Sequence, residues 1–101
     1  MRIIARSTLR EFGLKQPQAA TQLDAWYAIT SKATWRGPAD IKATFGNASI
    51  VSADRAVFNI KGNSYRLIVA FDFEKQIAFV KFVGSHAEYD KVDAATVEYG
   101  A

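Results

Sequence analysis

The stretch that decides the fold is residues 56–90, AVFNIKGNSYRLIVAFDFEKQIAFVKFVGSHAEYD. It holds three apolar and aromatic runs, which are Val57–Ile60, Tyr65–Phe73 and Ile77–Val83. Each run is rich in β-branched or aromatic residues and is bounded by Gly, Asn, Ser, Asp or Lys, which is typical of strands joined by tight turns. The stretch therefore predicts an antiparallel meander.

The segments before this meander predict an edge strand followed by two helices. The short, mostly apolar run Arg2–Ala5 is expected to form the strand, and Ser7 or Thr8 to cap a short helix that begins near Leu9. A second helix is predicted over Gln18–Ala33, because apolar residues recur there at spacings of three and four. These residues are Ala19, Leu23, Trp26, Tyr27 and Thr30.

The remaining segments predict short elements around the sheet. In the connector 34–48, Pro38 is expected to begin a short helix that turns Ile41 and Phe45 inward. Lys91–Tyr99 predicts a terminal helix. The fold class is therefore α+β, with an N-terminal helical hairpin packed on a mostly antiparallel sheet and a C-terminal helix, in a single domain over residues 1–101.

Composition excludes several classes of function. The chain has one His and no Cys, which removes disulfides, thiolate metal sites and a Cys nucleophile, so that no metal site is expected. Its longest apolar runs are far too short to cross a membrane, and no signal-peptide core is visible near the N-terminus. We therefore expect a cytoplasmic protein without a membrane association.

The net charge of +3 is modest, but the charges are unevenly distributed. Residues 1–66 hold ten Lys or Arg against four Asp or Glu, whereas residues 67–101 hold three against six. A basic first part and an acidic tail suit a domain with one surface that faces an anionic partner.

Polar residues interrupt the meander at one end of its first hairpin. If Gly62-Asn63 is a two-residue loop, Asn59 pairs with Arg66. Alternation along the strands then places Asn59, Lys61 and Arg66 on one face and their apolar neighbours on the other.

The next turn decides on which face His86 lies. A three-residue loop over Glu74–Gln76 places His86 on the side of Arg66, whereas a two-residue loop sends it to the opposite face. We favour the three-residue loop because of the pairs that it forms. These are Phe71 with Phe79, Leu67 with Val83, and Arg66 with Gly84.

A corner that gathers Asn59, Lys61, Arg66, His86 and Tyr89 has the groups that metal-free cleavage of RNA requires. An imidazole gives and takes protons near neutral pH. Arg and Lys stabilise the negative charge of a phosphorane intermediate.

Each of these residues also has a plain structural explanation. His86 could be an ordinary surface residue, and Lys61 beside a turn could simply be solvated. Lys81 could run its aliphatic stem along the apolar strand. Arg66 could form an ion pair with one of three carboxylates, which are Asp72, Glu88 and Asp90.

Three segments resemble the HigB-type toxins of bacterial toxin–antitoxin modules, within the RelE/ParE superfamily. They are Phe58–Ile68, Phe79–Asp90 and the connector Arg36–Lys42. The resemblance covers nearly the whole chain. It implies a RelE-like fold and the toxin of a type II system, a metal-independent endoribonuclease without cofactors that cleaves mRNA on the translating ribosome.

The resemblance also implies roles for single residues. Arg66 matches the strand Arg, His86 the acid/base position after the last strand, Lys61 a basic residue near the hairpin, and Tyr89 the aromatic that follows. Ser85 departs from the Thr that is more frequent in the family, although a hydroxyl remains. Three further residues are candidates for binding substrate: Asn59, Lys81 and Arg36.

The partners that the resemblance implies are mRNA, the ribosome and a cognate helix-turn-helix antitoxin of the HigA type. Operator DNA would be bound only through the complex with the antitoxin. Two alternatives stay open at this point. One is a non-catalytic toxin that poisons gyrase, and the other is a plain nucleic-acid-binding module of the same fold.

Overall fold

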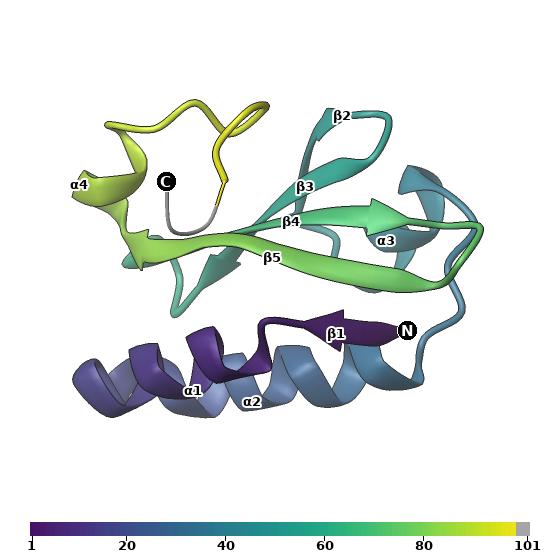
Figure 1. The fold of residues 1–101 in the computed structure, drawn as a ribbon. Helices are drawn as coiled ribbons and strands as arrows, with labels where there is room; N and C mark the ends of the chain where they lie inside the picture. The colour runs from purple at the N-terminus through teal and green to yellow at the C-terminus, as the bar shows by residue number, and fades with distance from the viewer. Residues whose placement is uncertain (99–101) are drawn as a thin grey trace.

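The computed structural model describes residues 1–98 and has an α+β fold (Figure 1). Its elements are β1 (Arg2–Ile4), α1 (Arg6–Lys15), α2 (Pro17–Lys32), α3 (Pro38–Thr44), β2 (Ser49–Ser52), β3 (Arg55–Ile60), β4 (Tyr65–Asp72), β5 (Ile77–Ser85) and α4 (His86–Tyr89). The strands form one sheet in the order β1-β5-β4-β3-β2, in which only β1 pairs in parallel. The predicted fold class is confirmed.

The two N-terminal helices lie along one face of the sheet (Figure 1). Helix α2 agrees with its prediction to within a residue at each end, and Pro17 is its first residue. Helix α1 begins at Arg6, and the predicted cap at Ser7 or Thr8 is wrong. The chain instead turns directly from β1 into α1 at Ala5, whose φ of 70° is left-handed.

The core lies between these helices and the sheet, and both tryptophans belong to it. Trp26 and Trp35 are buried, and Trp26 packs edge-on against Phe58 at 5.4 Å between ring centres. Trp35 packs in the same way against Phe71 at 5.7 Å. Ile41 of α3 is buried as predicted. We refer to the sheet face that packs on this core as the inner face and to the opposite face as the outer face.

The pairing of β3 with β4 confirms the predicted register, in which Asn59 lies opposite Arg66. The turn between β4 and β5 is longer than predicted, because the strands end at Asp72 and begin again at Ile77. Phe71 therefore pairs with Ala78, and its predicted pairing with Phe79 is wrong.

A β-bulge at Lys81 restores the predicted register farther along these two strands. Lys81 has no partner on β4, since Val80 pairs with Val69 and Phe82 with the preceding Ile68. Beyond the bulge, Arg66 lies opposite Gly84, as predicted.

The C-terminal helix is present, but it lies earlier than the predicted Lys91–Tyr99. It is the four-residue α4, which follows β5 directly. Residues 91–98 instead form turns, and Tyr99 lies outside the described residues. Figure 1 shows this segment on the outer face of the sheet, opposite α1 and α2. Two of its backbone carbonyls, those of Ala94 and Val97, accept hydrogen bonds from Arg55.

Candidate active site

The Arg66 side chain is held between the first hairpin and α4. Its Nη1 donates to the backbone oxygen of Asn63 at 3.0 Å, and its Nη2 lies 3.4 Å from the Asn63 Oδ1. The guanidinium carbon lies 5.6 Å from the centre of the Tyr89 ring, which is a cation–π distance. Within residues 1–98, none of the ion pairs considered for Arg66 forms.

His86 reaches the same aromatic ring from the start of α4. Its backbone N–H donates to the Ser64 oxygen at 3.0 Å, which joins α4 to the end of the first hairpin. The imidazole lies 6.5 Å from the Tyr89 ring and nearly parallel to it, and its Nε2 lies 3.9 Å from Asp90 Oδ2. His86 and Arg66 therefore share one side of the sheet, and the two-residue loop that would have separated them does not form.

A capping box sets the position of α4. The Glu88 N–H donates to Ser85 Oγ at 3.2 Å, while the Ser85 N–H donates to Glu88 Oε1 at 2.8 Å. The hydrogen bond from the Ser85 backbone is the largest cause that lowers the pKa of Glu88, followed by the bond with the Ser85 side chain. Gly84 is part of this packing, because a Cβ there would lie 2.7 Å from the end of the Phe82 ring and 3.1 Å from Glu88 Oε1.

Lys61 and Asn59 complete this end of the sheet. Lys61 follows β3 with a left-handed φ of 50°, and its backbone N–H donates to the side-chain oxygen of Gln22 on α2. Its side chain is exposed, whereas Asn59 is half-buried opposite Arg66. The contacts with Tyr89 bring together a guanidinium, an imidazole and a phenol at an open surface, a combination suited to binding a phosphate and moving a proton.

A comparison with known families shows to which family the chain belongs. The sequence model for HigB_toxin, the RelE-like toxic component of a toxin-antitoxin system, matches residues 19–92. This chain belongs to the HigB toxin family. Its partner in such a system is an antitoxin.

Curated members of the HigB family match over almost their full length. The mRNA interferase toxin HigB of Escherichia coli K12 is 32% identical over 92 residues, which is 89% of this chain and 88% of the relative. The mRNA interferase HigB of Escherichia coli O6:H1, strain CFT073, is 29% identical over 94 residues, or 91% of each chain.

Two of the residues predicted to bind substrate lie away from the Arg66–His86 corner in this HigB-family chain. Arg36 is at the opposite end of the sheet, because the oxygen of its neighbour Trp35 accepts a hydrogen bond from Gln76 beside the β4–β5 turn. Lys81 lies at the bulge in β5, where its Nζ is 2.6 Å from Glu98 Oε2.

Sequence reasoning missed Asn63 at this site and, farther along the sheet, the pair of Arg55 and Glu98. Asn63 was assigned only to the turn, although it holds the Arg66 side chain. Arg55 and Glu98 form an ion pair at 3.0 Å across 43 positions, for which the sequence carries no periodic signal.

Residues 1–98 contain neither a membrane-spanning helix nor a cluster of metal ligands. No helix there is long and apolar enough to cross a membrane. Nor do three or more His, Cys, Asp or Glu side chains in this range gather as they would around a metal ion.

Proposed function

We propose that this HigB-family toxin is an mRNA interferase that cleaves mRNA without a metal ion. The names of its relatives support this activity. The observation that carries the proposal is that Arg66 and His86 both lie against the ring of Tyr89, one at 5.6 Å and the other at 6.5 Å. A single phosphodiester bound in this corner would meet a cation and a proton-transfer group at the same time.

In the proposed reaction, the ribose 2′-oxygen attacks the neighbouring phosphorus and the bond from phosphorus to the 5′-oxygen breaks. The 2′-hydroxyl loses a proton and the leaving 5′-oxygen gains one, and His86 carries one of these transfers. The products are a 2′,3′-cyclic phosphate and a 5′-hydroxyl.

The basic side chains of Arg66 and Lys61 would stabilise the negative charge that develops on the phosphorane. The Arg66 guanidinium is already fixed by Asn63 and Tyr89, so that little reorganisation is needed when the charge develops. Lys61, which follows β3 on the same hairpin, would add a mobile point charge. Tyr89 acts as a positioning residue, because its ring contacts both Arg66 and His86.

The translating ribosome is the proposed place of action, which makes the toxin cytoplasmic. The corner is open, with His86 about half exposed, and offers little surface with which to select a sequence. Placement of mRNA by the ribosome would supply the proximity that so small a site lacks. The proposed partner that silences the toxin is a helix-turn-helix antitoxin of the HigA type, through which the complex would bind operator DNA.

The test is inducible expression with and without the neighbouring antitoxin gene, followed by mapping of RNA 5′ ends. New ends inside translated codons are expected for the wild type. His86→Gln and Arg66→Gln should each lower the cleavage rate about 100-fold or more. Arg10→Gln, which removes an exposed cation from α1, is the matched control and should cleave normally.

The outcome of this experiment separates the proposal from its alternatives. Full cleavage by a folded His86→Gln/Arg66→Gln double variant would rule out the proposed site. DNA damage without RNA cuts would instead indicate a gyrase poison.

A further inference from the structure

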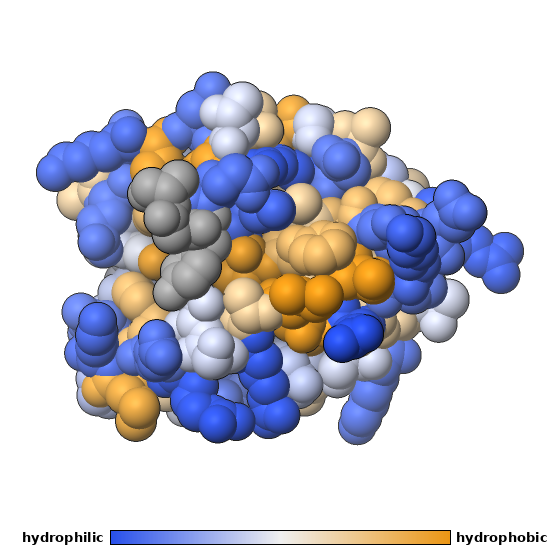
Figure 2. All heavy atoms as spheres, viewed as in Figure 1, coloured by the Kyte–Doolittle hydropathy of each residue, from blue (hydrophilic) through white to orange (hydrophobic). Residues whose placement is uncertain are grey.

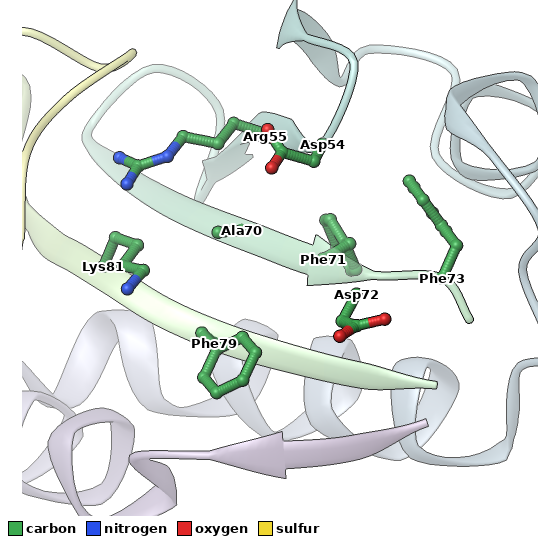
Figure 3. Close-up of a pocket in the computed structure, with 8 residues that line it drawn as sticks. All are labelled: Asp54, Arg55, Ala70, Phe71, Asp72, Phe73, Phe79 and Lys81. Carbon is green, nitrogen blue, oxygen red and sulfur yellow. The ribbon is translucent and has the colours of Figure 1, made fainter. Parts of the chain in front are cut away.

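A second polar pocket lies on the outer face of the sheet, away from the Arg66–His86 corner (Figure 3). Its volume is about 470 Å³, within the range of small-molecule sites. Arg55 and Lys81 lie at one end of this pocket, Phe79 forms a wall, and Ala70 lies on its floor (Figure 3). The space-filling view shows apolar side chains near β5 bordered by hydrophilic ones (Figure 2).

The basic end of the pocket is occupied by a carboxylate from the C-terminal segment. Arg55 Nη2 lies 3.0 Å from Glu98 Oε1, and Lys81 Nζ lies 2.6 Å from Glu98 Oε2. The two basic side chains are only 11% and 22% exposed, whereas that of Glu98 is 54% exposed. The two oxygens of the exposed Glu98 carboxylate therefore each neutralise one largely buried basic side chain, Arg55 or Lys81.

This geometry is also one in which a phosphate group fits. Phosphate and carboxylate both present neighbouring oxygens to Arg and Lys, and phosphate carries at least as much charge. The hydrogen bond from Lys81 is the largest cause that lowers the pKa of Glu98, which indicates that these cations favour a charged oxygen acceptor.

The wall of the pocket supplies a surface for a base. Phe79 is partly exposed, and its partner across the strands is the small Ala70, which leaves the ring open to the pocket. Lys81 Nζ lies 5.5 Å from the centre of this ring. An aromatic ring beside a basic group is the arrangement by which proteins bind single-stranded nucleic acid with little regard for sequence.

The pocket also lies on the path that a bound strand would follow. Ala70 and Arg66 are on the same strand and point to the same face, and four residues of strand span about 13 Å. A short length of extended RNA held at Arg66 would reach the pocket.

We propose that this pocket is a nucleotide subsite for the single-stranded RNA substrate, and that Glu98 occupies its phosphate position in the unbound protein. This inference rests on the proposed function. Asp54 and Asp72 also line the pocket, and their carboxylates accept hydrogen bonds from Ser52 Oγ and from the Lys75 N–H. The phosphate enters at Arg55 and Lys81, and the base lies against Phe79.

The experiment measures binding of a short single-stranded RNA with 2′-O-methyl riboses, which cannot be cleaved, by fluorescence anisotropy. Glu98→Gln should bind about fivefold more tightly than the wild type, because the competing charge is gone. Glu11→Gln makes the same change of net charge on the exposed side of α1 and should bind as the wild type does. Equal effects of Glu98→Gln and Glu11→Gln, or none from Glu98→Gln, would overturn the proposal.

Two further variants test the phosphate and base positions separately. Lys81→Gln should weaken binding of this RNA, and Phe79→Leu should weaken it about tenfold through the lost stacking. Phe79→Leu should leave binding of inorganic tripolyphosphate unchanged, because that probe has no base. If Phe79→Leu binds the RNA as the wild type does, no base occupies the pocket.

A parallel cleavage assay on translated mRNA separates this inference from the proposed function. Cleavage by the wild type together with an unchanged affinity of Glu98→Gln would refute the subsite and leave the nuclease intact. Tighter binding by Glu98→Gln in a protein that never cuts mRNA would support the subsite and refute the nuclease.

Discussion

Among single residues, Lys61 combines a strained backbone with a proposed catalytic charge. Its φ of 50° is left-handed, a conformation that costs an ordinary residue roughly 1 kcal/mol or more but that Asn tolerates. Lys61→Asn should therefore keep the free energy of unfolding or raise it by up to about 1 kcal/mol, while it lowers the RNA cleavage rate. Urea denaturation and single-turnover cleavage measure the two effects. A variant that is both stable and fully active would remove Lys61 from the mechanism.

The sequence predicted some single residues of the site and missed others for a physical reason. Arg66 and Asn59 follow from a hairpin whose tight turn around Gly62-Asn63 sets the pairing of its strands. The position of Arg36 could not be predicted, because the length of the connector does not determine which end of the sheet the connector lies beside. Glu98 could not be found, since its partner Arg55 is distant in sequence and no repeating pattern links a strand to a segment without regular structure.

At the scale of elements, α4 depends on its capping box. Ser85→Ala removes the hydroxyl that accepts from the Glu88 N–H and should destabilise the protein by about 1 kcal/mol. Because α4 carries His86 and Tyr89, cleavage should fall as well. Ser7→Ala, at an exposed position in α1 without a capping role, is the control. A Ser85→Ala variant with wild-type stability and activity would contradict this role.

The same capping box predicts a dependence of α4 on pH. The pKa of Glu88 in the folded protein lies below its ordinary value of 4.5. The stability that the charged Glu88 carboxylate gives to α4 is therefore fully present above about pH 4.5. It is lost as the pH falls through the lowered pKa of the folded protein. Relative to the intrinsic exchange rate at each pH, the α4 amides should become less protected over this acid range in the wild type but not in Glu88→Gln. Identical acid profiles would refute the linkage.

Two elements near the C-terminus show where prediction from periodicity fails. The bulge at Lys81 changed the register of β4 and β5 partway along the strands, which alternation alone cannot indicate. The segment 91–98 has helical spacing, but Asp93 Oδ1 accepts from the Ala95 N–H and Arg55 binds the carbonyls of Ala94 and Val97. These contacts compete with the hydrogen bonds of a helix.

At the scale of the whole molecule, the basic and acidic parts of the sequence do not form separate surfaces. The ion pairs that Arg55 and Lys81 form within residues 1–98 both use the carboxylate of Glu98, and the Asp90 carboxylate lies 3.9 Å from His86 Nε2. The acidic tail thus lies against the basic sheet, and an RNA must compete with it.

The affinity for single-stranded RNA should depend on salt more steeply in Glu98→Gln than in the wild type. Each phosphate neutralised by the protein releases counterions that contribute about −0.7 to the slope of log K against log salt concentration. In the wild type, the displaced Glu98 carboxylate stays nearby and takes up a cation of its own, which offsets this release. Glu98→Gln should therefore steepen the slope by about 0.7, and Glu11→Gln should not. Binding isotherms of the 2′-O-methyl RNA between 50 and 200 mM salt, roughly the range over which such slopes are resolved, measure the difference. Parallel lines for Glu98→Gln and the wild type would mean that Glu98 and the RNA bind at different places.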